Sequence, residues 1–445
     1  MGSGSSKGTT QVVAADSTRF NSVNNNDQAA KPSHSAESPE SQNGDTGQSG
    51  RDAKNSKTQP FLKSSRPEPE QRSAEISTSS LHENNTETGD QKSSQQDSTV
   101  LLTSFSEKNP KMEPALKKVR DHYQALKDAL DNGSLVTLTA VEHVKGVFGV
   151  YCDNHKPTKS VLADFAIALG FPKLAYDIII DRRTNDQGLT TWDREIDKEQ
   201  GTKTTKGEKT SGSTENQESK EDEDNIAKLK ISQDLICFLF GVLVNFSDLH
   251  DPFCLACNEA GMVQLFVEMT KELQDSIPHN VKFVEPETQR LTEFTVRGKM
   301  LSRSLGILHN LSRRVPTRKT FVACQAVNLL IPLLKAEITF YSAKSLLILA
   351  YLIDEENNHL IMTDEGPIKF LTSLLKKAMG TAYHRYLGFA ARELAEGLTQ
   401  IAVNDNNKKT IVKCGAIPIL VKMLQKAKDD DEKINACKHV VDFGF

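Results

Sequence analysis

From about residue 112 onward, apolar residues recur at intervals of three and four, the spacing that puts side chains on one face of an α-helix. Near the end of each helical stretch stands one polar residue, which we call its centre. A new stretch begins at a glycine or alanine, at a nearly constant number of residues after the centre. The pairs are Asn245 and Gly261, Asn310 and Ala326, Tyr351 and Gly366, Gln400 and Gly415, and more weakly Asn154 and Gly170. Repetition at a fixed spacing predicts a repeat architecture.

The residues around these centres repeat as well. Two positions before the centre stand Leu243, Leu308, Leu349 and Leu398, and one position after it Phe246, Leu311, Leu352 and Ile401. The fourth and eighth residues after the restart are Leu265, Leu330, Phe370 and Ile419, then Met269, Leu334, Leu374 and Met423. Each unit is predicted to hold a long helix, a short connecting helix, a break with positive φ and a second long helix. Stacked units share one core, and the weak first unit is predicted to cap it.

One stretch carries a family resemblance. Cys414-Gly415-Ala416-Ile417-Pro418-Ile419-Leu420-Val421-Lys422-Met423-Leu424 resembles the armadillo repeat, whose consensus has the form L-x-N-L-S, a spacer, then G-A-I-P-x-L-V-x-L-L. The resemblance covers roughly residues 112–445 when all copies are included. It implies an all-α fold, an armadillo-type right-handed α-solenoid.

Composition sets the expected domain boundaries. Only 37% of the 445 residues are apolar, and the deficit is concentrated in polar stretches. Residues 1–111 are predicted to be a long disordered N-terminal tail, because they cannot bury enough apolar surface to offset their conformational entropy. Residues 112–445 are predicted to form the helical repeats, with a disordered insertion at 184–225 and a shorter insertion at 276–299.

Charge and cysteine usage narrow the class of protein. The formal net charge of −4 gives no bulk attraction to nucleic acid, so no nucleic-acid partner is expected. The longest apolar run, Leu235 to Phe246, is shorter than a membrane span and is predicted to be a buried repeat helix. Seven scattered cysteines and no N-terminal apolar stretch favour a reducing compartment. A cytoplasmic protein without cofactor or metal is expected.

The extreme N-terminus carries a lipidation pattern. Gly2, Ser6 and Lys7 fit the acceptor sequence for N-myristoylation, with Gly2 as the acylated residue after Met1 is removed. The alternative is a chance match in a tail rich in glycine and serine. One acyl chain gives only marginal membrane binding, and no nearby cysteine or basic cluster supplies a second signal. Weak, reversible membrane association is therefore predicted.

The asparagine centres are the binding candidates. In armadillo proteins that bind extended peptides, the resemblance implies that this asparagine lines a groove and bonds the peptide backbone. Asn245 and Asn310 match the position, and Asn154 is a weaker match. Tyr351 and Gln400 replace the asparagine in later copies, and Gly241 and Gly306 stand where import receptors carry tryptophan. The alternative is that these asparagines cap or bridge adjacent turns.

Two other clusters favour structural roles. Cys254 and Cys257 form a C-x-x-C without the strand context of a redox site or the further ligands of a zinc site, so they are predicted to be small apolar residues on a repeat helix. Arg313, Arg314, Arg318 and Lys319 are predicted to lie in a solvated loop between helices. The tripeptide Asp442-Phe443-Gly444 lacks every other kinase motif, and no catalytic constellation is expected.

The sequence therefore predicts a non-enzymatic scaffold or adaptor that binds protein or peptide ligands and touches membranes weakly through myristate. The tail, interrupted repeats and closing repeat also resemble the armadillo region of invertebrate armadillo-plus-TIR proteins, without the TIR domain. That resemblance implies an alternative: a regulatory, autoinhibitory or adaptor module of a TIR-type innate-immune or NAD-hydrolase signalling protein, with a TIR-domain partner supplying the catalytic part.

Overall fold

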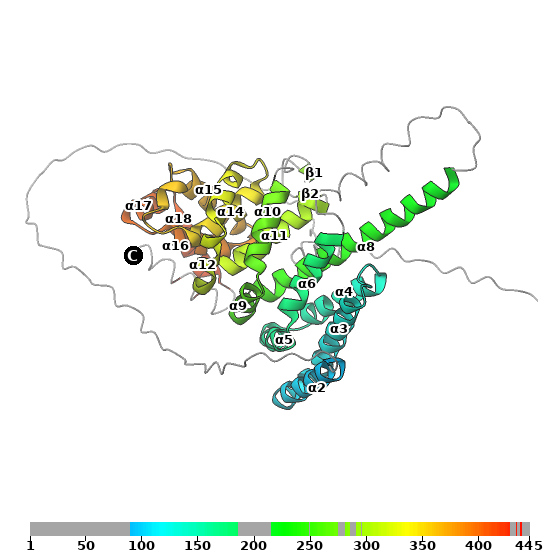
Figure 1. Ribbon diagram of the computed structural model, residues 1–445. Helices are drawn as coiled ribbons and strands as arrows, with labels where there is room; N and C mark the ends of the chain where they lie inside the picture. The colour runs from blue at the N-terminus through cyan, green and yellow to red at the C-terminus, as the bar shows by residue number, and fades with distance from the viewer. Residues whose placement is uncertain are drawn as a thin grey trace, which may run out of the picture. The chain divides into compact units, whose positions relative to one another are not determined.

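The computed structural model describes residues 90–185, 215–248, 250–274, 281–284, 291–294 and 296–427, and positions 433 and 437 (Figure 1). The chain divides into two units, Met1–Asp90 and Gln91–Phe445, and the described residues belong almost wholly to the second. Helices make up most of the described residues, as the sequence predicted.

The described part begins with a helical cap. It contains α2 (Asp90–Lys108), the 3-10 helix η1 (Pro110–Met112), α3 (Glu113–Asp131) and α4 (Leu138–Cys152). Leu116, Val119 and Leu126 recur at helical spacing and are fully buried on α3, which packs against α4. Thr137 caps α4, because its hydroxyl accepts a hydrogen bond from the backbone N–H of Ala140 at 3.2 Å.

Repeat units of three helices each follow, which we call groups, and the members of a group are its first, second and third helix. The first group contains α5 (Lys156–Ala168), α6 (Phe171–Asn185) and α8 (Glu215–Asp248). The second contains α9 (Asp251–Glu259), α10 (Met262–Gln274) and α11 (Val296–Ser312). The third contains α12 (Val315–Ala323), α13 (Ala326–Leu330) with η4 (Pro332–Lys335), and α14 (Thr339–Leu352). The fourth contains η5 (Asn358–Leu360), α15 (Gly366–Ala378) and α16 (Ala391–Ile401). A further group begins with α17 (Asp405–Lys413) and α18 (Ala416–Lys426).

The third helices form the spine of the fold. Each of α4, α8, α11, α14 and α16 packs against the next, so that segments far apart in the sequence lie side by side (Figure 1). The leucines two positions before each centre are all fully buried, as predicted: Leu243, Leu308, Leu349 and Leu398. Burial of one such side chain stabilises the fold by about 2 kcal/mol. Stacking therefore creates one core shared by all groups.

The second helices follow the predicted spacing less closely. Leu265, Met269 and Leu330 are buried as expected, but Phe370 and Ile419 are only half-buried. In α15 and α18 the adjacent Leu371 and Leu420 are buried instead. At the eighth position Leu374 and Met423 are buried as predicted, and Leu334 is half-buried. The buried stripe of these helices is therefore wider than one residue per turn.

Left-handed backbone marks most of the breaks. Gly170, Gly261 and Gly415 have φ of 82°, 87° and 78°. In the third group the break lies at Gln325, with φ of 54°, one residue before the predicted Ala326. Gly366 has no positive φ and simply begins α15. The glycine requirement is therefore strict at three breaks, because L residues with a side chain adopt this conformation at a cost.

Two predicted boundaries are wrong. The polar tail does not extend to residue 111, because α2 begins at Asp90 and Phe105 packs against Phe165 with ring centroids 5.2 Å apart. The first insertion is shorter than 184–225, since α6 reaches Asn185 and α8 begins at Glu215. Both differences arise where the sequence is dominated by polar residues and has little apolar repetition at helical spacing. The remaining residues of the predicted tail and insertion lie outside the described part.

Short strands were also missed. The predicted insertion at 276–299 contains β1 (Val281–Val284) paired antiparallel with β2 (Leu291–Phe294), and α11 already begins at Val296. A second small pair, β3 (Arg385–Tyr386) and β4 (Phe389–Ala390), precedes α16. Their strands are too short for a two-residue alternation to stand out in the sequence.

Helix α8 is the longest in the described part. Asp224–Asp248 is long and apolar enough to pass a test for a membrane span, with a mean hydropathy of 1.5 over its best window. Leu235, Leu239, Phe240 and Leu243 are nevertheless fully buried against neighbouring helices, so these residues form core, as predicted for this run. A core helix and a membrane span share the same composition, and burial within the fold accounts for it here.

Two third-helix glycines should respond oppositely to alanine. A Cβ at Gly397 would lie 2.2 Å from Leu347 Cδ2 in the core, whereas a Cβ at Gly306 would meet Val244 Cγ2 at 3.5 Å, an ordinary contact. Gly397→Ala is expected to lower the free energy of unfolding by about 1–3 kcal/mol, and Gly306→Ala to raise it by up to about 1 kcal/mol. Urea unfolding measures both. Equal stability of the two variants would contradict the packing described.

Candidate functional site

The predicted asparagines define one face of the stacked third helices. Positions four, seven and eleven residues before each centre lie on the same helical face as the centre. We call this set the ladder face: Asn245, Gly241, Phe238 and Asp234 on α8; Asn310, Gly306, Arg303 and Lys299 on α11; Tyr351, Leu347, Lys344 and Phe340 on α14; Gln400, Glu396, Glu393 and Phe389 on and beside α16.

Asn245 and Asn154 bond to their own chain segment. Asn245 Nδ2 donates to the carbonyl oxygen of Gly241 at 2.8 Å, and Asn154 Nδ2 to that of Val150 at 2.6 Å. Both side chains are half-buried. Asn154 lies just past the end of α4 rather than on it. Each contact uses one amide hydrogen, so Asn245 keeps a second N–H and its carbonyl oxygen on the ladder face.

Asn310 has a different role from Asn245. It is only 5% exposed, and its Nδ2 donates to Val244 O at 3.1 Å and to Ser247 Oγ at 3.0 Å, both on the preceding third helix. The alternative left open from the sequence, a bond between adjacent turns, describes the contacts of Asn245 and Asn154, whereas Asn310 bonds to a different helix. Asn310 therefore fastens α11 to α8.

Side chains that reach a neighbouring helix often bond to its backbone. Tyr151 OH donates to Asn245 O at 2.8 Å, Arg303 NH1 donates to Cys237 O, and Arg313 NH1 donates to Asp248 O at 3.2 Å. Asn245 and Asp248 lie in the last turn of α8, whose carbonyl oxygens lack partners within the helix, so these bonds satisfy them. Cys237 O lies inside the helix and accepts with its second lone pair.

A buried ion pair closes the ladder face between α14 and α16. Lys344 Nζ lies 2.5 Å from Glu393 Oε1, with side chains 11% and 17% exposed. The same ammonium stands 4.7 Å from the centroid of the Phe389 ring, a cation–π arrangement. Glu393 also accepts a bond from the backbone N–H of Ala390, three residues earlier at the start of α16. One carboxylate thus holds a cation and caps a helix.

Electrostatics keeps this pair charged. Burial alone would raise the pKa of Glu393, but the positive charges of Lys344 and Arg313 outweigh it and hold the pKa at about 2. His309 Nδ1 lies 3.3 Å from Glu393 Oε1, yet burial first and Lys344 second keep the pKa of His309 well below its usual value. His309 is therefore neutral at pH 7.

Arg313 links a second cluster. Its NH2 donates to Glu396 Oε2 at 2.9 Å, and Tyr351 packs beside it, with burial and then Glu396 raising the pKa of that phenol. Arg318 lies 5.6 Å from the Tyr351 ring centroid, and Arg314 pairs with Asp251 at 2.8 Å. The prediction of a solvated loop for these arginines is wrong, because each is held by a carboxylate or a ring.

The α4–α8–α11 part of the ladder face is more open. Asp234 and Lys299 are exposed, and Phe238 and Arg303 are half-buried. Lys145 on α4 stands 4.8 Å from the centroid of the Phe238 ring. The two ends of the ladder face therefore differ. At the α14–α16 end the charged groups are buried in ion pairs, and at the α4–α8–α11 end polar and aromatic groups remain accessible.

The remaining candidates have structural roles. Cys254 and Cys257 are fully buried on α9, and burial raises the pKa of Cys254 to about 11, which confirms the interpretation as small core residues. His250 caps α9 by accepting from Phe253 N at 3.1 Å and pairs with Asp164 at 3.1 Å. No group of three metal-ligand side chains occurs among the described residues. Gly2, Ser6 and Lys7 lie outside them.

Sequence reasoning missed Lys344, Glu393 and Glu396. A signal existed, since these residues stand seven, seven and four positions before the centres Tyr351 and Gln400. A charged residue inside an apolar helical stripe is expected to be buried, and a buried charge needs a partner of opposite sign. The equivalent position of the next repeat is where such a partner can be sought.

The packing and the family match together decide the fold. Residues 404–437, which include α17 and α18, match the Armadillo/beta-catenin-like repeat family. Each third helix stacks on the next in the same way throughout the described part. The fold is an armadillo-type α-solenoid.

Comparison with solved structures finds similar chains. An engineered protein is 15% identical with a TM-score of 0.37, covering 73% of this chain and 96% of its own. A designed armadillo repeat protein in complex with the peptide (KR)4 is 12% identical with a TM-score of 0.32, covering 68% and 97%. A structure titled for the interaction between cadherin and beta-catenin is 16% identical with a TM-score of 0.33, covering 69% and 45%. No curated protein matches the sequence.

Loss of the Glu393 charge should destabilise the solenoid in a pH-dependent way. Glu393→Gln keeps the shape but leaves Lys344 as a buried, unpaired cation, so the free energy of unfolding at pH 7 is expected to fall by about 3 kcal/mol. The wild-type advantage is present above the usual carboxyl pKa of 4.5 and is lost as the pH falls toward about 2. Urea unfolding of both proteins from pH 7 to pH 3 measures this difference.

A constant difference between wild type and Glu393→Gln across that pH range would contradict the ionised pair. The double variant Lys344→Met/Glu393→Leu is the control, because it removes both charges and fills similar volume. It is expected to lie within about 2 kcal/mol of wild type at every pH.

Proposed function

We propose that this chain is a non-enzymatic protein-binding scaffold whose ladder face on α8 and α11 takes up an extended peptide. The observation that carries the proposal is the half-buried amide of Asn245, which keeps a donor and an acceptor on an open part of that face. A peptide bond needs one of each. The armadillo-repeat match at residues 404–437 supports a binding role for the stacked helices.

The charged groups of the fold support a binding role over catalysis. His309 is neutral and buried, the Cys254 thiol has a raised pKa, and Glu393 is held by Lys344. A general base or nucleophile needs a pKa near the working pH and access to a substrate. These groups stabilise the solenoid instead.

Two asparagines should separate binding from stability. Peptides are first selected on the wild-type chain from a phage-displayed random linear library. Asn245→Ala is expected to weaken the binding of these peptides about tenfold. It should leave thermal unfolding unchanged, because the Asn245 side chain bonds within its own helix, to Gly241. Asn310→Ala is expected to lower the free energy of unfolding by about 1–3 kcal/mol, because it leaves Val244 and Ser247 without their partner. Failure of the library to yield any peptide would overturn the proposal.

We further propose reversible membrane contact through a myristoyl group on Gly2, as the first seven residues of the sequence suggest. A cytoplasmic protein that visits membranes follows from a single acyl chain. Labelling with an alkyne-tagged myristate in cells, followed by fractionation, tests this. Wild type is expected to carry the label and to distribute between membrane and soluble fractions. Gly2→Ala should lose both label and membrane fraction, and an unlabelled wild type would contradict the proposal.

The regulatory alternative, a module that restrains a TIR-type enzyme, stays a prediction from the sequence. Affinity capture of the full chain with a TIR-domain partner would favour it over an independent scaffold.

A further inference from the structure

A carboxylate on the open part of the ladder face is surrounded by cations from three helices. Asp234 on α8 lies within electrostatic range of Lys230 on the same helix, Lys145 on α4 and Lys299 on α11. Arg303 stands four residues, about one helical turn, after Lys299 on α11. These five residues form what we call the Asp234 cluster. Glu142 pairs with Lys145 at 2.8 Å, so the three lysines outnumber Asp234 and Glu142.

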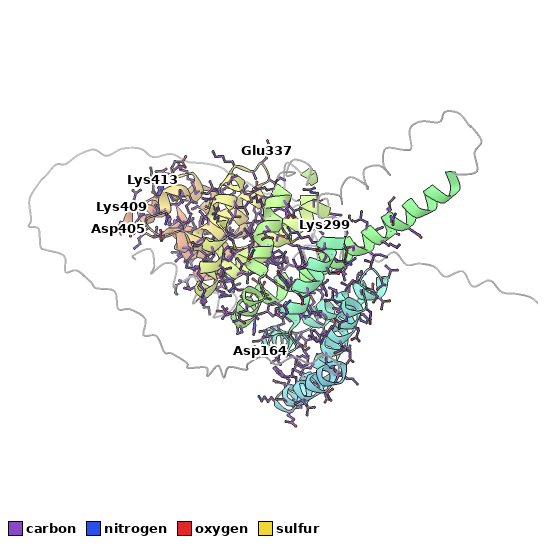
Figure 2. All side chains as sticks on the ribbon, in the orientation of Figure 1. Asp164, Lys299, Glu337, Asp405, Lys409 and Lys413 are labelled. Atoms are coloured by element: carbon purple, nitrogen blue, oxygen red, sulfur yellow. The ribbon has the colours of Figure 1, made fainter. Side chains whose placement is uncertain are left out.

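Two of these cations lie near Asp234 without pairing directly with a carboxylate. Within the residues that the structure describes, Lys230 and Lys299 are exposed and form no ion pair. Figure 2 labels Lys299 at the surface of α11. At the other end of the ladder face, by contrast, Lys344 and Arg313 are held by Glu393 and Glu396 at 2.5 Å and 2.9 Å. An anionic ligand would therefore find available cations only at the α4–α8–α11 end.

The charges of the cluster are accessible to a ligand. Asp234 is exposed, so water screens its attraction for the surrounding lysines and leaves their charge available. The Phe238 ring, one turn further along α8, adds an apolar contact beside the lysines.

We infer that the Asp234 cluster selects acidic segments, so that the peptide bound by this scaffold carries Asp or Glu side chains at this end of the ladder face. The inference rests on the proposed function and names the chemistry of its partner. Lys230, Asp234, Phe238, Gly241 and Asn245 fall on one stripe of α8, since they are spaced by three and four residues. One ligand can therefore meet the amide of Asn245 and the lysines together.

A peptide fits this cluster better than a membrane or a nucleic acid. Those polyanions are held by broad surfaces of one charge, and the chain has a net charge of −4. The cluster is small, contains a carboxylate of its own, and interleaves cations with an aromatic ring. Such mixed, discrete groups suit individual side chains of a peptide.

Charge reversal in the full chain tests the inference. The probe is a fluorescein-labelled linear peptide of alternating Glu and Ser, compared with alternating Lys and Ser, and fluorescence anisotropy measures binding. The Glu-Ser peptide is expected to bind, more weakly as salt rises, and Lys230→Glu and Lys299→Glu should each weaken it about tenfold. Lys299→Gln should give a smaller loss. Lys409→Glu on α17, labelled in Figure 2, makes the same charge change elsewhere and should leave binding unchanged.

The outcomes separate the two levels of the proposal. Glu-Ser binding that is unaffected by both reversals, or tighter binding of the Lys-Ser peptide, overturns the inference. The library peptides selected on the wild type could be basic or neutral and bind more weakly to Asn245→Ala. In that case the acidic preference fails while the scaffold function stands. If no peptide is selected, both fail. Vesicles containing phosphatidylserine that bind in place of the Glu-Ser peptide, and detach from the Lys230→Glu chain, would also overturn the inference. Circular dichroism confirms that each variant is folded.

Discussion

The fold depends on the fact that no three-helix group can cover its own apolar surface. Leucines such as Leu243 and Leu308 are fully buried on third helices that pack both on the second helix of their own group and on neighbouring third helices. A group taken alone would lose the contacts with its neighbours. The stability of each group therefore includes a contribution from its neighbours, as in a one-dimensional chain of coupled units.

This dependence on neighbours explains how charge is distributed along the ladder face. Between α14 and α16 the ladder face is buried at Lys344, and a buried cation needs a charged partner, which Glu393 provides. Between α8 and α11 the positions equivalent to Lys344 and Phe340 are more open: Arg303 is half-buried and bonds to Cys237 O, and Lys299 is exposed. One repeat pattern thus yields a closed structural end and an open end suited to recognition.

Helical periodicity was enough to predict the fold, because burial of residues such as Leu349 and Leu398 follows from their spacing alone. The site was harder to predict. Asn245 and Asn310 have the same sequence context, yet one lies on the ladder face and the other is buried against Ser247. That difference depends on how closely two particular helices approach, which no local pattern encodes. The Lys344–Glu393 pair likewise joins residues that only the stacking brings together.

The bonds that Tyr151, Arg303, Asn310 and Arg313 make to neighbouring backbone carry an evolutionary consequence. Every residue type offers a carbonyl oxygen, so the helix that receives such a bond can change its side chains without breaking the joint. Sequence drift in one group then leaves the attachment of the next intact. A solenoid fastened in this way can diversify the ligands of its ladder face, repeat by repeat, while the mechanical connection between repeats is inherited unchanged.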